Sequence, residues 1–344
     1  MGRCPCPRCT VPMSRVPNLG MSRDMKERDT LARVDDRVRQ NKIKSARAHI
    51  YGSALGVTST AVENLLTDQS LVPASVSFVI YLPLNRDHSV KNAFSDRLAF
   101  LGFNLFCMLV VDLMHEFELG VWKALFTHLL RILASAQVGN TLVNELDRRY
   151  RMIPTFGGDT IRKFASNTSE MKRMAARDFE DVLQVSLHPN HLSPLLRGDQ
   201  CAIPVFDALL PEPHNKNVLT LLFTCAYWHA LAKLRMHTDK TLSLLDTITE
   251  RLGKCLRHFQ RGTCTAFDTK ELKREADSRQ RRELKTGVAS TSQAARRQKT
   301  FNLETYKLHA LGDYASSIRK YGTTDSYSTE PACNSRRTDS FLLM

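Results

Sequence analysis

The stretch from Val110 to Ala136, VVDLMHEFELGVWKALFTHLLRILASA, decides the fold of this chain. Its apolar residues recur at helical spacing and form a wide face, which predicts one long helix packed in the core. The residues of this face are Phe117, Val121, Trp122, Leu125, Phe126, Leu129, Leu130, Ile132 and Leu133. The aliphatic run that precedes the helix, from Met108 to Val111, predicts a short buried strand. The sequence therefore places Asp112 and His115 at a strand-to-helix junction.

Asp112 and His115 form a D-x-x-H pair on the first turn of this helix. An aspartate in this position commonly caps the helix, because its side chain accepts hydrogen bonds from unpaired backbone N–H groups and complements the helix dipole. A histidine one turn later is commonly a packed side chain. A single D-x-x-H pair is a weak indication of a site, so both structural roles stand beside a functional one.

The composition describes an ordinary globular chain with an unusual charge. Its 344 residues are 42% hydrophobic and 24% charged, enough for one large or two ordinary domains. The net charge of +14, with a pI near 9.5, favours a polyanionic partner such as DNA, although a merely basic surface is the alternative. No charge-free apolar run reaches the length of a transmembrane helix, and the N-terminus lacks the apolar core of a signal peptide. Nine scattered cysteines then indicate free thiols in a reducing compartment, the nucleus or otherwise the cytoplasm.

The Cys-rich N-terminal segment, residues 1–20, contains a candidate half-site for zinc. Cys6 and Cys9 have the C-x-x-C spacing that lets one tight turn offer two thiolates to an ion. No second C-x-x-C follows, so the remaining ligands have to come from a distant segment. The alternative is a set of unligated thiols.

Two segments interrupt the helical pattern. Residues 21–75 are charged and helix-compatible, and residues 92–184 form the core helical region with the D-x-x-H pair. The two segments of sixteen residues, 76–91 and 185–200, both begin with Val-Ser and end in a residue whose codon can be AAG or CAG. Val-Ser can be encoded by GTAAGT, an intron donor sequence, so we hypothesise that both are retained introns. Genuine surface loops are the alternative.

The core helical region also holds the basic residues most suited to contact DNA. They favour phosphate contacts, since nothing in this stretch resembles a reading helix. The candidate residues are Arg148, Arg149, Arg162, Lys163, Lys172 and Arg173. The neighbouring acids Asp178, Glu180 and Asp181 are expected to pair with basic residues, with a metal site as the alternative.

The remainder of the chain divides by composition. Residues 201–267 predict an antiparallel helix pair, and residues 268–300 predict a basic linker, helical and then partly disordered, that either tethers DNA or is simply solvated. Residues 301–330 predict a helix ending at Gly322 and an acidic motif with Asp325 and Glu330. Residues 331–344 form a divergent tail.

Five successive stretches resemble a known family. They are DLMHEFELGVWKALFTHLLRIL, PTFGGDTIRKFASNTSEMKRMAARDFEDVLQ, PVFDALLPEPHN, HALAKLRMHTDKTL and KLHALGDYASSIRKYGTTDSYSTE. In this order they resemble the C-terminal part of Plavaka-type transposases, fungal cut-and-paste DNA transposases related to the CACTA group. The resemblance implies a mainly α, bundle-like C-terminal part of an RNase H-like transposase, without most of the sheet.

The resemblance also implies roles for individual residues. Asp112 and His115 correspond to an accessory D-x-x-H motif, and Glu330 corresponds to the third of three catalytic acids that hold two Mg²⁺ ions. In zinc-bearing relatives a Cys pair is completed by histidines shortly before the third acid, so His309 is the implied partner of Cys6 and Cys9, with His229 or His237 next.

The expected function follows from that correspondence. The first two catalytic acids are expected upstream of the Cys pair, where this sequence does not extend, so we expect a truncated, inactive remnant. Its expected partners are DNA, an intact transposase or a second copy of itself, and no membrane. The alternatives are a non-enzymatic helical scaffold and, if the gene model is incomplete, an active metal-dependent strand transferase.

Overall fold

The computed structural model describes residues 2–71, 93–155, 161–170, 174–184, 202–286 and 295–329, and the chain divides into two compact units. The first unit comprises Met1–Val110 with Glu304–His309. The second comprises Val111–Leu303 with Ala310–Met344. The chain therefore enters the first unit twice, at its N-terminus and again near its C-terminus.

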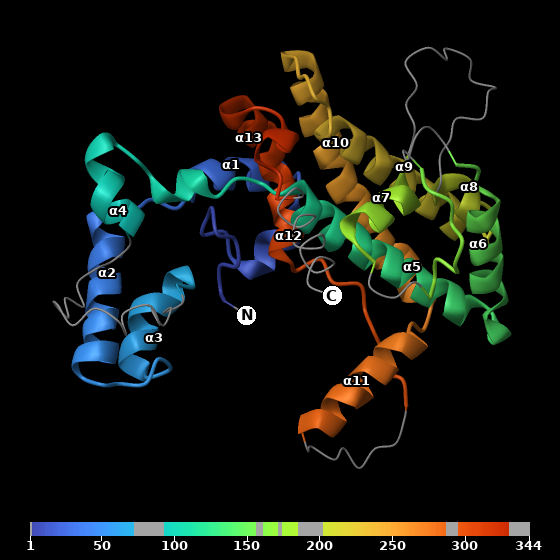
Figure 1. Ribbon diagram of the computed structural model, residues 1–344, viewed down its shortest axis with the longest axis horizontal. Coiled ribbons are helices and arrows are strands. Elements are labelled where there is room, and N and C mark those ends of the chain that lie inside the picture. Colours follow the sequence, from blue (N-terminus) through green and yellow to red (C-terminus); the bar gives the residue numbers. More distant parts are fainter. Residues whose placement is uncertain are drawn as a thin grey trace, which may run out of the picture. The chain divides into compact units, whose positions relative to one another are not determined.

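The described residues are mainly helical, as the sequence predicts (Figure 1). The α-helices are α1 (Ser22–Thr30), α2 (Arg37–Arg47), α3 (Thr60–Leu66), α4 (Ala93–Leu98), α5 (Lys123–Ala136), α6 (Thr141–Met152), α7 (Ala176–Leu183), α8 (Ala202–Phe206), α9 (His214–Ala232), α10 (Asp239–His258), α11 (Lys273–Thr286), α12 (Tyr306–Ala310) and α13 (Tyr314–Tyr321). Within the described residues the β-type pairing consists of two isolated bridges, Cys9 with Ala32 and Lys270 with Gln298. None of the described helices combines the length and the apolar character needed to cross a lipid bilayer.

The predicted central helix of the second unit is present, and it has two parts. Leu113–Trp122 (η7) has the wide hydrogen bonding of a π-helix, and α5 continues it in α-helical geometry. Trp122, Leu125 and Ile132 on its inner face are fully buried, and each such side chain contributes about 1.5–3 kcal/mol by leaving water. The indole N–H of Trp122 donates to the Phe179 carbonyl at 2.7 Å, which ties η7 to α7.

The predicted helix pair is formed by α9 and α10, which pack side by side (Figure 1). Thr238 caps α10, since its hydroxyl accepts from the Thr241 backbone N–H at 3.3 Å while the Thr241 hydroxyl accepts from the Thr238 N–H at 2.8 Å. Between the two helices, the buried indole of Trp228 donates to the Thr249 hydroxyl at 2.9 Å. The polar ends of these buried groups are thus satisfied inside the core.

Two small apolar clusters belong to the first unit, and Val16 and Leu19 are also fully buried there. Ala46 on α2 packs with Val62 and Leu66 on α3. The other cluster joins Cys6, Cys9 and Val11, with Leu31 packed against it.

One local expectation is wrong. Residues 108–111 form no strand: the helical turn Leu105–Met108 ends there and Leu109 is half-exposed, because the described residues offer no neighbouring strand for it to pair with. Val34 and Val38 are exposed, whereas Leu31 packs against the cluster of Cys6, Cys9 and Val11. The described end of the basic linker pairs with residues 269–271: the backbone N–H of Lys299 donates to the Thr269 carbonyl at 2.9 Å, and the backbone N–H of Glu271 donates to the Arg297 carbonyl at 2.8 Å.

Several predictions fall on residues outside the described ranges. They concern the segments 76–91 and 185–200, the residues Lys172, Arg173 and Glu330, and the tail 331–344. The retained-intron hypothesis and the assignment of Glu330 stay predictions.

Candidate metal centre

The C-x-x-C turn of the first unit places two thiols side by side in a buried position. Cys6 and Cys9 are 1% and 3% exposed. The backbone N–H of Arg8 points at the Cys6 sulfur at 3.4 Å, which closes the turn around that atom. Pairing on both sides of Cys9 fixes the turn against the end of α1: Thr10 donates to the Leu31 carbonyl and Arg33 donates to the Arg8 carbonyl, each at 2.9 Å. The turn therefore holds both sulfurs without a metal.

The third side chain comes from the other end of the sequence. His309 lies on α12, is fully buried, and its Nε2 is 3.1 Å from the Cys9 sulfur. The two residues are 300 positions apart in the sequence. The ligand atoms of Cys6, Cys9 and His309 all lie within 4.8 Å of one another, and they form the one group of three or more potential metal ligands among the described residues. The histidine that the resemblance implied is thus the one that meets the Cys pair.

The outer nitrogen of His309 faces α1. Asp24 Oδ1 lies 3.5 Å from His309 Nδ1, and Arg28 Nη2 lies 3.1 Å from the same nitrogen. Asp24 is itself fixed, since its other oxygen accepts from the Gly20 backbone and from Arg28 at 2.9 Å. Because a guanidinium only donates, Nδ1 accepts from Arg28 in this arrangement, and Asp24 Oδ1 has no hydrogen-bond partner among the described residues. Zinc binding through Nε2 requires the proton on Nδ1, where it would point toward Asp24.

The electrostatics of this contact favour the charged carboxylate. Burial by itself raises the pKa of Asp24, but the adjacent His309 and the charge of Arg28 outweigh it, so the pKa lies below its usual value. Burial lowers the pKa of His309, yet its contacts with Asp24 and Cys6 reverse the shift and leave it raised. The side chain that orients His309 is therefore an anion at neutral pH.

A buried arginine, Arg33, stabilises the cysteine loop through its backbone carbonyls. Arg33 is 8% exposed, and its guanidinium donates to the carbonyls of Cys6 at 3.0 Å, Cys9 at 3.1 Å and Cys4 at 3.2 Å. Three carbonyls of a short loop are thereby satisfied by one cation. The positive charge beside the loop also favours thiolates, the form in which cysteine binds metal. Cys4 does not join the centre, because its thiol donates to the Asp68 carbonyl.

The donor set fits zinc. Two thiolates and one imidazole are typical zinc ligands, and ligand bonds of 2.0–2.3 Å put tetrahedral donor atoms roughly 3.5–3.8 Å apart. The Cys9–His309 distance of 3.1 Å and the outer limit of 4.8 Å bracket that spacing. Shifts of about 1 Å in the side chains would centre an ion. The three protein ligands leave the fourth position of a tetrahedral ion for a water molecule or another donor.

The second unit brings the D-x-x-H pair against Thr329, near the end of the acidic motif. Asp112 caps η7 and its Oδ2 is 2.7 Å from His115 Nδ1. The hydroxyl of Thr329 donates to the same carboxylate oxygen at 2.8 Å, and it lies 3.2 Å from His115 Nδ1. Both roles foreseen for Asp112, as cap and as partner of His115, are therefore combined. The neighbouring Glu116 is buried and accepts from the Tyr314 hydroxyl at 3.2 Å.

The basic residues expected to contact DNA are partly occupied within the protein. Arg148 and Arg149 both pair with Glu145, and Arg162 pairs with Asp178 and Asp181. Lys163 is exposed. The contact of these basic residues with DNA stays a prediction. The acidic residues Asp178, Asp181 and Glu180 form ion pairs, as expected, and the partner of Glu180 is Lys233.

Sequence reasoning missed the three charged residues that support the centre. Asp24 and Arg28 are spaced four apart on a charge-rich helix and resemble an ordinary solvated pair, yet both are buried. Arg33 lies in the short link after that helix. The alternative histidines are elsewhere: His229 is buried against Glu118 at 3.0 Å, and His237 lies 3.3 Å from the Thr241 hydroxyl.

No protein-family model, curated protein or solved structure matches this chain.

Proposed function

We propose that this chain is a zinc protein descended from a DNA transposase, in which one ion bound by Cys6, Cys9 and His309 fastens the N-terminal turn to α12. The observation that carries the proposal is the meeting of three buried metal-binding side chains from positions 300 residues apart. An ion that joins segments so distant in the sequence contributes directly to the free energy of folding.

The proposed descent has its own support. Five stretches of the sequence resemble Plavaka-type transposases in order, and that resemblance implies the partnership of the Cys pair with His309. A mainly helical fold agrees with the expected C-terminal region. An RNase H-like origin, a nuclear location and partnership with an intact transposase are parts of the proposal that follow from the resemblance.

The test is the zinc content of the purified full-length chain, measured by elemental mass spectrometry. We expect one zinc per chain, and loss of the ion in Cys9→Ser and His309→Gln. Replacement by Co²⁺ should give the sulfur-to-metal charge-transfer absorption of two thiolates, and Cys6→Ser, like Cys9→Ser, should remove it together with the ion.

Two cysteines of the same unit provide matched controls. Cys4 is buried nearby but bonded to the Asp68 carbonyl, and Cys107 is exposed. Cys4→Ser and Cys107→Ser should keep the zinc. If the unmodified chain binds none, or if Cys4→Ser loses as much as Cys9→Ser, the proposal is wrong.

The proposed absence of strand-transfer activity needs a separate assay. Incubation of the chain with supercoiled plasmid and Mg²⁺ should produce neither nicking nor joining. Magnesium-dependent nicking that disappears in Glu330→Gln would instead identify an active enzyme.

A further inference from the structure

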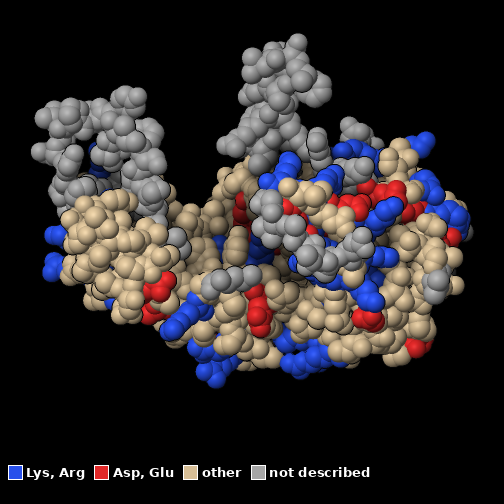
Figure 2. Space-filling view, turned by 90° about the horizontal axis from the view of Figure 1, so that it is seen from below, with Lys and Arg blue, Asp and Glu red and all other residues tan. Residues whose placement is uncertain are grey.

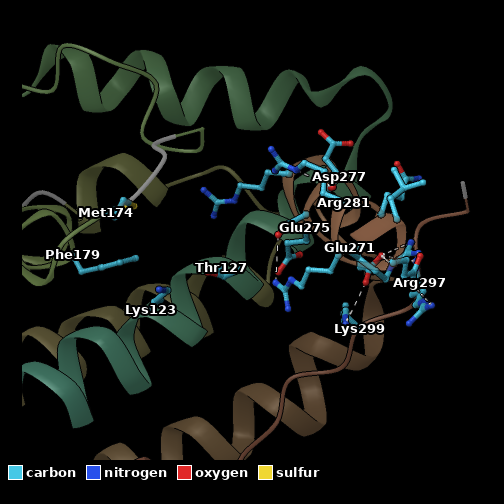
Figure 3. Close-up of a pocket in the computed structure, with 17 residues that line it drawn as sticks. Lys123, Thr127, Met174, Phe179, Glu271, Glu275, Asp277, Arg281, Arg297 and Lys299 are labelled. Atoms are coloured by element: carbon cyan, nitrogen blue, oxygen red, sulfur yellow. Dashed lines mark hydrogen bonds and ion pairs between the residues drawn. The ribbon is translucent and has the colours of Figure 1, made fainter. Parts of the chain in front are cut away.

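A large cavity of the second unit lies between α5 and α11. Its volume is about 1220 Å³. In Figure 3, Lys123 and Thr127 of α5 line one wall, Asp277 and Arg281 of α11 line the other, and Lys299 comes from the segment that returns along residues 269–271. Small-molecule sites in proteins usually enclose about 300–1,000 Å³. The cavity is therefore of the order of size that a small ligand needs.

The lining of the cavity has a positive charge. It holds seven Lys or Arg side chains against four Asp or Glu side chains, an excess of three positive charges. Three of those acids are already ion-paired: Glu271 with Arg279, Glu283 with Arg297, and Glu275 with Arg131. Figure 2 shows Lys and Arg side chains interspersed with Asp and Glu side chains on the face that it views. An anion in the cavity would meet cations whose charge the protein does not balance.

Two of the cations, Arg281 and Lys123, have no acidic partner among the described residues. Among the described residues, no carboxylate lies within ion-pair distance of Arg281 or Lys123. The guanidinium Nε of Arg281 donates to the Asp277 carbonyl at 3.2 Å, which leaves the terminal nitrogens available. Lys123 extends its ammonium over the Phe179 ring, 5.4 Å from the centroid. The two side chains are exposed and come from opposite walls.

A third cation indicates that the cavity favours negative charge. Arg274 lines it and is largely withdrawn from water, and this burial lowers its pKa. Glu275 partly offsets the shift, whereas the adjacent Arg131 adds to it. Cations crowded in this way are stabilised when an anion enters.

The small number of aromatic side chains in the lining indicates the chemical class of the ligand. Single-stranded nucleic acid sites combine a basic groove with aromatic side chains on which bases stack. Here Phe179 is the one aromatic residue of the described lining, and it is 3% exposed and covered by Lys123. Arginine-rich cavities of this size suit phosphate groups, because the guanidinium fork matches phosphate oxygens.

We propose that the cavity between α5 and α11 binds a small anion carrying several phosphate groups, gripped by Arg281 from one wall and Lys123 from the other. The site is independent of the zinc ion, which lies in the first unit.

The experiment is isothermal titration calorimetry of the full-length, zinc-supplemented chain with inositol hexakisphosphate and, separately, ATP, in buffer without divalent cations. We expect saturable binding of one molecule per chain, weakening as KCl rises from 50 to 200 mM because the contacts are ionic. Arg281→Gln and Lys123→Gln should each weaken binding about tenfold, the effect of losing one charged hydrogen bond. Arg281→Lys should retain part of the affinity.

The matched control is Arg148→Gln. It removes the same charge from an exposed helix of the same unit, but from an arginine paired with Glu145 outside the cavity. Its affinity should equal that of the unmodified chain. Zinc content should be unchanged in every variant, so failure here and failure of the metal centre can be told apart. Three results would each overturn the proposal: no binding of either probe, equal weakening by Arg148→Gln, or binding of a thymidine oligonucleotide in their place.

Discussion

At the scale of single residues, a charged group next to a metal ligand determines the orientation of that ligand. Asp24 and His309 are both buried. Among the described residues, Asp24 is the carboxylate that lies beside His309 Nδ1, at 3.5 Å. Carboxylates in this position orient the imidazole and raise its basicity. The anion on α1 is therefore part of the proposed centre even though it does not touch the metal.

Asp24→Asn should lower zinc affinity by about 10- to 100-fold, the usual cost of removing such a partner. The measurement is competition with a chromophoric chelator. Asp29→Asn, an exposed change on the same helix, should leave the affinity unchanged. If Asp24→Asn lowers the melting temperature of the metal-free chain but binds zinc with full affinity, Asp24 has only a structural role.

His128 presents a different residue-scale problem, because it is fully buried on α5 and neither ring nitrogen has a hydrogen-bond partner among the described residues. It packs against Phe259 and Phe301, with ring centroids 6.2 and 5.2 Å away. Burial lowers its pKa to about 4, with a further contribution from Arg131. The unfolded chain, with a histidine pKa near 6.5, binds the proton more readily.

Stability should therefore fall as the pH drops from about 6.5 toward 4, because the unfolded state gains protons that the folded state excludes. At pH 5 this group alone should cost about 2 kcal/mol relative to pH 7. His128→Leu should remove that part of the pH dependence in urea unfolding, whereas His258→Gln, at an exposed position, should not. An unchanged pH profile in His128→Leu would contradict the assignment.

At the scale of elements, helix ends and helix geometry determine where the polar groups lie. The ten residues of η7 are π-helical at the point where Asp112, His115 and Glu116 gather. π-helical turns are rare and often occur at functional positions, because the extra residue re-aims side chains. The sequence predicted a helix there, but not this geometry, since an apolar repeat does not distinguish the two hydrogen-bonding patterns.

Gly322 ends α13 in a backbone conformation that other residues avoid, with φ 89° and ψ −169°. A Cβ added there would meet only the Ser326 hydroxyl oxygen, at 3.7 Å, so the cost of a substitution is backbone strain. Gly322→Ala should destabilise the second unit by about 1–3 kcal/mol. Gly262→Ala, in the helical turn Phe259–Thr263 with open space around it, should have the opposite sign. Urea unfolding of both variants provides the measurement, and equal effects would refute the argument.

At the scale of the whole molecule, the division into two units should be visible when zinc is removed. The proposed ion belongs to the first unit, whereas both tryptophans of the chain, Trp122 and Trp228, are buried in the second. Tryptophan fluorescence therefore reports on the unit without the metal.

Chelation should destabilise the first unit and leave the tryptophan transition in place. At a zinc concentration 1,000 times the dissociation constant, the ion adds about 4 kcal/mol to the unit that binds it. Circular dichroism should then show an earlier loss of helix after chelation, while the fluorescence midpoint stays the same. Coincident shifts of both signals would mean that the two units unfold as one.

How much was predictable varies with the range of the interaction. The central helix, the α9–α10 pair with its Thr238 cap and the end at Gly322 followed from local patterns, because periodicity and capping act within a few residues. The strand at residues 108–111 was wrong, since a strand requires a partner that a local pattern cannot supply. His309 was found through a resemblance, and neither its spacing nor its composition would have selected it among eleven histidines.

The sequence by itself determined a basic, mainly helical chain, the two thiols of one turn and the D-x-x-H cap, because covalent neighbours and helical repeats are sufficient for these. Only the tertiary structure decided which charges are buried. It turned Asp24, Arg28 and Arg33 inward around His309, paired Arg148 and Arg162 with acids, and left Lys123 and Arg281 facing a cavity. Solvation and pairing of a charge depend on groups distant in sequence, and the chain brings those groups together only when it folds.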